Sequence, residues 1–71
     1  MSKYRFYFDS DTVDYYAEGF KQTQFGNGWA GTALAIYKYI ADECEWEDEA
    51  DMRLLYLDLL EQVEDKINEQ L

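Results

Sequence analysis

The residues best suited to chemistry lie in one short acidic run of this 71-residue sequence. Seven of the ten positions from Asp42 to Asp51 are acidic, and a tryptophan, Trp46, lies in the middle of the run. Clustered carboxylates can bind divalent cations, work as a paired acid and base, or attract a positively charged surface. The spacing of the ligands and the elements that position them decide between these chemistries.

The spacing does not predict a specific metal site. The acidic segment that begins at Asp9 has Val13 at the fifth position of a calcium loop and lacks glycine at the sixth. The run from 42 to 51 also lacks that glycine. The sequence contains no histidine and one cysteine, Cys44, so it has no zinc-ligand set. We expect no metal and no cofactor beyond weak association of divalent cations.

Enzymatic activity is not expected either. Histidine, the usual general base near neutral pH, is absent, and Ser2 and Ser10 are the only serines. Neither serine lies in a nucleophile motif. Cys44 falls on the apolar side of a predicted helix, which indicates a buried structural thiol. The glycine-rich stretch 25–31 lacks a following phosphate-binding lysine, which favours a turn.

The charge of the chain points to a class of partner. Sixteen acidic residues against six Lys and Arg give a formal net charge of −10, which disfavours direct binding to nucleic acid or to an anionic membrane. No apolar stretch is long enough to span a bilayer, and no signal peptide is evident. We therefore expect a single acidic domain over residues 1–71, cytoplasmic, with a basic protein as its partner.

The hydrophobic pattern predicts an α+β fold that is mostly helical, with one N-terminal strand followed by three helices. Residues 3–8 alternate in the manner of a half-buried strand. Apolar residues at helical spacing predict helices over about 11–21, 28–44 and 48–70, the last one long, with Asp48 as its N-cap. Residues 22–31 are assigned to a loop. Whether residues 22–25 form a second strand, completing a short two-stranded hairpin, stays open at this stage.

The long helix carries two unusual features. Acidic residues recur opposite its apolar stripe at three- and four-residue steps and form a charged line of about 30 Å. Leu54 and Leu57 fall toward this acidic side. Either the helix is packed on two sides, which is the favoured explanation, or the two leucines form an exposed contact patch.

These patterns favour a non-enzymatic protein that presents carboxylates and aromatic rings to its partner. Trp is the residue most enriched at interface hot spots, and the charges exceed what solubility needs. The simpler alternative is a solvated corner whose charges only cap the third helix. The predicted partner-binding residues are Asp42, Glu43, Glu45, Trp46, Glu47, Asp48, Glu49 and Asp51 in the run, Asp58, Glu61 and Asp65 on the third helix, and Asp14 and Tyr15 on the first.

In its size, its charge of −10, its seven tyrosines and the run from Asp42 to Asp51, the chain resembles the small acidic DNA-mimic inhibitors of phages and mobile elements. These include anti-restriction and anti-CRISPR proteins. The resemblance implies an inhibitor that occupies the basic nucleic-acid-binding groove of a target, such as a Cas9-type nuclease or its complex with nucleic acid, in the host cytoplasm. The alternative is a small homo-oligomeric assembly or adaptor module, in which an apolar surface around Leu54, Tyr56 and Leu57 drives dimerisation.

Overall fold

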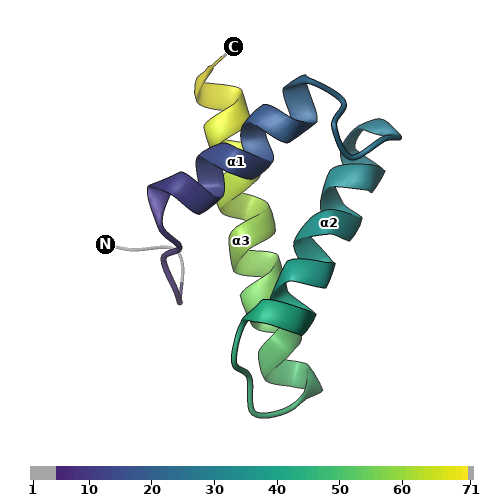
Figure 1. Cartoon of the computed structure of the whole chain (residues 1–71). Helices are drawn as coiled ribbons and strands as arrows, with labels where there is room; N and C mark the ends of the chain where they lie inside the picture. Colours follow the sequence, from purple (N-terminus) through teal and green to yellow (C-terminus); the bar gives the residue numbers. More distant parts are fainter. Residues whose placement is uncertain (1–4, 71) are drawn as a thin grey trace.

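The computed structural model describes residues 5–70, which contain three α-helices (Figure 1). α1 spans Ser10–Lys21, α2 spans Gly28–Glu43 and α3 spans Glu49–Glu69. α2 and α3 run in opposite directions, α1 crosses the C-terminal half of α3, and every pair of helices is in contact. The Cα trace measures 33 × 30 × 17 Å, so the molecule is a slab about two helices thick. Within residues 5–70, no helix is long and apolar enough to cross a membrane.

The predicted N-terminal strand, and with it the α+β class, is wrong: no strand occurs among residues 5–70. Lys3 and Tyr4 of the predicted strand lie outside the described residues. The rest of the segment forms no ladder with another strand. Instead, the side-chain amide of Gln62 on α3 bonds to it, donating to Phe6 O at 2.7 Å and accepting from Phe8 N at 3.1 Å. The alternating pattern therefore belongs to a segment packed on a helix.

The possible second strand, residues 22–25, is a series of turns. Thr23 has a φ of 53° and Gly26 a φ of 89°, both in the left-handed region that breaks an extended chain. Turn bonds follow from this geometry: Thr23 N donates to Phe20 O at 3.1 Å, and Gly26 N donates to Thr23 O at 3.2 Å. The loop thus directs the chain from α1 into α2 without offering a strand to residues 5–8.

Phe25 is the centre of the α1–α2 connection. A Cβ atom on Gly19 of α1 would collide with the Phe25 ring, and one on Gly31 of α2 would collide with the Phe25 carbonyl oxygen. Both glycines therefore allow a close approach of the loop to the two helices, which explains why a weak helix former is found inside each.

The three predicted helices lie within two residues of their expected bounds, because the spacing of their apolar residues is a local property. Their inner faces form one core, which α3 contributes to along most of its length. Asp48 is the N-cap of α3, as predicted, and accepts a hydrogen bond from Asp51 N at 2.9 Å. The buried apolar residues of the core are Val13, Tyr16, Ala17, Ile36, Ile40, Leu59, Val63 and Ile67.

Candidate functional site

The acidic corner, residues 42–51, joins α2 to α3 at one end of the molecule (Figure 1). Two of its acids hold the start of α3. Asp48 accepts from the backbone of Asp51, and Asp51 Oδ2 accepts in return from Glu47 N at 3.2 Å. The two bonds satisfy the Asp51 amide, which the first helical turn leaves without a partner, and the Glu47 amide just before the N-cap. Asp48 and Asp51 therefore have a structural role.

Trp46 links the corner back to α2. Its Nε1 donates to the carbonyl oxygen of Ala41 at 3.4 Å, close to the C-terminal end of that helix. The side chain is nevertheless 39% exposed, so much of the indole remains accessible from solvent. The corner thus presents an anchored aromatic ring surrounded by carboxylates.

The remaining acids of the corner have no comparable structural role. Asp42 and Glu43 lie in the last turn of α2, where the helix dipole is negative, and no basic residue is present in that turn. Glu45 and Glu47 are exposed between the helices. Within residues 5–70, none of these four carboxylates forms a hydrogen bond or an ion pair. Glu49, by contrast, lies favourably at the positive end of α3.

The predicted line of acids on α3 is partly covered by the N-terminal segment. Asp51, Asp58 and Asp65 follow one another at seven-residue steps, and Asp58 Oδ2 accepts from Phe6 N at 3.2 Å. A hollow of about 270 Å³ lies here, lined by Arg5, Phe6, Glu45, Asp51, Leu55 and Asp58. Asp58 therefore helps to hold the segment, and the line is not a continuous open stripe. Glu61 is exposed on another side of α3.

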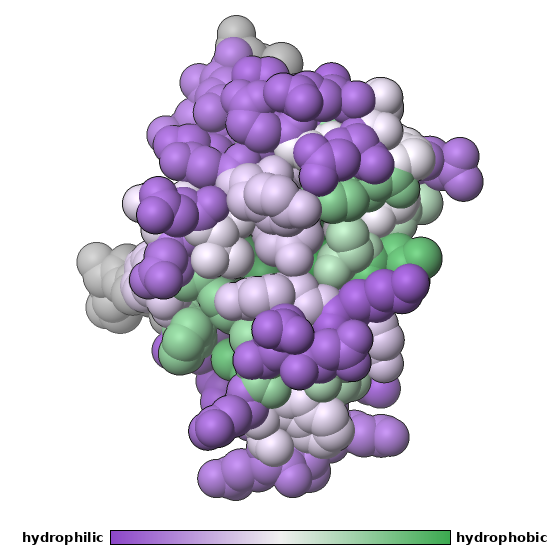
Figure 2. Space-filling view, viewed as in Figure 1, coloured by the Kyte–Doolittle hydropathy of each residue, from purple (hydrophilic) through white to green (hydrophobic). Residues whose placement is uncertain are grey.

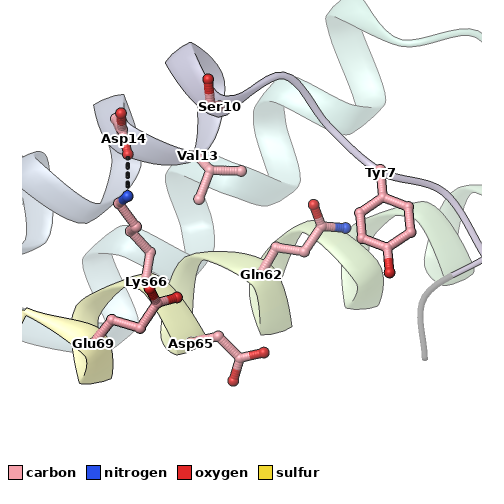
Figure 3. Close-up of a pocket in the computed structure, with 8 residues that line it drawn as sticks. All are labelled: Tyr7, Ser10, Val13, Asp14, Gln62, Asp65, Lys66 and Glu69. Atoms are coloured by element: carbon pink, nitrogen blue, oxygen red, sulfur yellow. Dashed lines mark ion pairs between the residues drawn. The ribbon is translucent and has the colours of Figure 1, made fainter. Parts of the chain in front are cut away.

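Asp14 and Asp65 lie far from the corner and line the same pocket of about 260 Å³ between α1, α3 and the N-terminal segment (Figure 3). Lys66 reaches across the pocket and places its Nζ 3.4 Å from Asp14 Oδ1. Because this ion pair joins two helices, the sequence contained no local signal for it. Tyr15, the other predicted residue on α1, is 53% exposed and accepts a hydrogen bond from Gln24 Nε2 at 3.2 Å.

The predicted site residues therefore separate into a corner group and a distant group. Eight of them gather at the corner, Asp14, Tyr15 and Asp65 belong to the α1 side of the molecule, and Asp58 and Glu61 lie on α3 in neither group. In the view of Figure 2, hydrophilic side chains cover both ends and hydrophobic surface appears across the middle. Within residues 5–70, no group of three or more Asp, Glu or Cys side chains is arranged to hold a metal ion.

Leu54 and Leu57 are 40% and 48% exposed, so α3 does not bury them against a second partner among residues 5–70. Two residues of α2, Leu34 and Tyr37, are similarly exposed at 56% and 43%. Tyr37 contacts Tyr56 of α3 edge to face, with ring centroids 5.7 Å apart.

The Cys44 thiol and the Tyr16 and Tyr39 phenols lie in surroundings that raise their pKa values. Burial raises the pKa of the Cys44 thiol, and the neighbouring Glu43 carboxylate raises it further, whereas a hydrogen bond with Tyr39 acts in the opposite direction. Burial also raises the pKa of Tyr16 to about 12. The thiol is half-buried beside the core, less buried than the sequence predicted.

Comparison with known proteins gives no relative. No family model matches the chain. No curated protein and no solved structure matches it either.

Proposed function

We propose that this chain binds the basic nucleic-acid-binding surface of a protein through the acidic corner and thereby inhibits that protein as a nucleic-acid mimic. The corner offers a dense cluster of exposed carboxylates close in sequence to an accessible indole. A charged surface of this kind accelerates association with an oppositely charged groove and favours it over other partners.

The observation that carries the proposal is the position of the acids that do not help the fold. Asp42 and Glu43 oppose the dipole of α2, and Glu45 and Glu47 add further like charges within a few residues. Together these groups lower the stability of the corner. Residues that break a local rule without a compensating intramolecular contact are expected at functional sites.

Trp46 adds the apolar component that a tight interface needs. Its ring is held by Ala41, so little conformational entropy is lost when a partner covers it. Tryptophan is among the residues most enriched at the energetic centre of interfaces.

The test uses capture by the immobilised chain from a host lysate. We expect basic nucleic-acid-binding proteins to be retained at about 0.05 M NaCl and released by about 0.5 M, because salt screens exposed charges. Added duplex DNA should displace them. Each captured protein is then purified, and its binding to labelled DNA or RNA is measured while the chain is titrated in.

A pair of matched variants separates the corner from overall charge. The corner variant replaces Glu43, Glu45 and Glu47 with Lys, and the control replaces the exposed acids Asp11, Glu18 and Glu69 with Lys. Each replacement changes the charge by two, so both variants go from −10 to −4. Asp48 and Asp51 are kept because they cap α3. We expect the corner variant to lose about tenfold or more in competition. Equal losses in both variants would contradict a specific role for the corner.

The exposed leucines of α3 favour a second candidate, a homo-oligomeric assembly or adaptor module. In that case an apolar surface that includes Leu54 and Leu57 is covered by another copy. Association of two copies that each carry −10 should strengthen with salt, whereas binding to a basic partner should weaken. Sedimentation at micromolar concentration in low and high salt distinguishes the two candidates.

A further inference from the structure

A groove with an apolar centre and an acidic rim runs between α2 and α3, apart from the acidic corner. It consists of two adjoining hollows of about 320 and 390 Å³ that share Leu57. Tyr37, Met52 and Tyr56 line the first hollow, and Trp29 and Leu60 line the second. All the residues that line either hollow come from α2 or α3, so neither α1 nor residues 5–9 cover the groove.

The centre of the groove is apolar and well fixed. Leu57 and Tyr37 are each close to half exposed, and the Tyr37 ring packs edge to face on Tyr56, which restricts its movement. The side chains project from the middle of two long helices, so their positions do not depend on a loop. A contiguous group of exposed apolar side chains is typical of an interaction site.

The rim of the groove carries a charge of its own. Glu49 lies at one end, while three acids lie at the other, and Arg53 is the single basic residue among those that line the two hollows. The acids at the second end are Glu61, Glu64 and Asp65. A ligand that is apolar in the middle and positive at its edges is complementary to this arrangement. A second copy of this chain carries a net charge of −10 and is therefore not complementary to the acidic rim.

The length of the groove indicates the form of that ligand. From Glu49 to Asp65, α3 advances about 24 Å at 1.5 Å per residue. A helix of roughly 16 residues laid along the groove covers the same distance and can place apolar side chains at three- and four-residue steps against Leu57 and the two tyrosines.

We propose that the α2–α3 groove binds an amphipathic helix whose apolar side is flanked by Lys and Arg, contributed by the basic partner. The inference rests on the proposed function and specifies the partner: it must present such a helix next to its nucleic-acid-binding surface. The corner, at the Glu49 end of the groove, then supplies charge, and the groove supplies apolar contact.

The test measures binding of the full chain to a defined probe, a 16-residue peptide of Leu and Lys with its leucines on one side of a helix. The control peptide has the same composition with its leucines distributed all round the helix. Two variants of the chain, Leu57→Glu and Leu54→Glu, add the same charge to the same helix at similarly exposed positions, but only Leu57 lines the groove.

We expect the amphipathic peptide to bind more tightly than its control, and Leu57→Glu to weaken that binding about tenfold or more. Leu54→Glu should bind as the parent chain does, or slightly more tightly because of its added charge. Equal binding of the two peptides, or tighter binding by Leu57→Glu, would show that charge alone attracts the peptide and would overturn the proposal. A dimer that excludes the peptide would overturn it in favour of a second copy.

Failure of the groove and failure of the corner give different experimental results. The Lys variant of Glu43, Glu45 and Glu47 leaves the groove unchanged, and Leu57→Glu leaves the corner unchanged. Loss of competition by Leu57→Glu alone would support the groove and reject the corner. Loss by the corner variant alone, with no preference between the peptides, would do the reverse.

Discussion

Gln62 donates a hydrogen bond from its side-chain amide to the carbonyl oxygen of Phe6 at 2.7 Å, although the two residues are 56 positions apart. The same amide accepts from Phe8 N at 3.1 Å, and its side chain is almost fully buried. One glutamine therefore provides for the N-terminal segment the pair of bonds that a neighbouring strand would otherwise supply.

Replacing Gln62 with Leu should destabilise the fold by about 1–3 kcal/mol, because two backbone groups of the segment lose their partners. Urea denaturation measures the change, and hydrogen exchange at the Phe8 amide should accelerate. As a control on the same helix, Asn68→Ala at an exposed position should shift stability by less than about 0.5 kcal/mol. Similar losses in both variants would argue against a specific role for the amide.

The N-caps of α1 and α3 should differ in their contribution to stability. Both are aspartates, but only Asp48 forms a side-chain capping bond, whereas Asp9 forms none. Asp48→Ala should therefore cost about 0.5–2 kcal/mol, and Asp9→Ala clearly less. Thermal unfolding of the two variants provides the comparison, and a larger loss for Asp9→Ala would contradict the assignment.

Two acids of the corner, one at the end of α2 and one at the start of α3, should respond in opposite ways to charge reversal. Glu43→Lys places a positive charge at the negative end of α2 and should raise stability by about 0.3–1 kcal/mol. Glu49→Lys should lower it by a similar amount, because it removes a favourable charge at the start of α3. Denaturation at low ionic strength measures both effects, and both should shrink in high salt. A stabilised Glu43→Lys that also binds its partner less well would show that the corner trades stability for binding.

Alanine at Gly31 should destabilise the fold, although alanine is normally the better helix former by about 1 kcal/mol. The new Cβ would meet the carbonyl oxygen of Phe25, and backbone cannot move aside as a side chain can. Gly19→Ala meets only the Phe25 ring, so the double variant Gly19→Ala with Phe25→Leu should recover part of its loss. Calorimetry of the single and double variants tests this order. Recovery of Gly31→Ala by Phe25→Leu would contradict it.

Stability should fall at alkaline pH because of Tyr16. Burial, together with the nearby Tyr15 and Tyr39, raises the pKa of this phenol from 10.0 to about 12. Since the folded-state pKa lies above that of the unfolded chain, the stabilisation is fully present below pH 10 and is lost as the pH rises toward 12, by on the order of 2–3 kcal/mol. Tyr16→Phe should reduce this dependence in denaturation curves. Tyr39 and Cys44, whose pKa values are also raised by burial, should account for the remainder.

The helices could be predicted from the sequence, whereas the strand could not. Helical spacing in segments such as Met52 to Ile67 determines both the element and the face that it buries. The alternation at residues 3–8 indicates only an extended chain, because a strand also needs a partner and the loop at Thr23 and Gly26 does not provide one. The favoured explanation of Leu54 and Leu57, that a second packed side of α3 buries them, was also wrong, since both remain exposed.

The candidate site could also be predicted only in part, because the sequence pattern reveals local features but not how the helices cross. The corner is contiguous in sequence, and the Asp48 cap follows from a local rule. The ion pair between Asp14 and Lys66 and the groove at Leu57 depend on how the helices cross, which no short segment specifies.

The connections between the helices are short, six residues between α1 and α2 and five between α2 and α3. Each hairpin can therefore close with little loss of chain entropy, and such topologies commonly fold in roughly microseconds to milliseconds. The docking of α1 on the distant end of α3 closes the longest loop. We expect it to be the step that limits how soon after synthesis the protein is ready to bind.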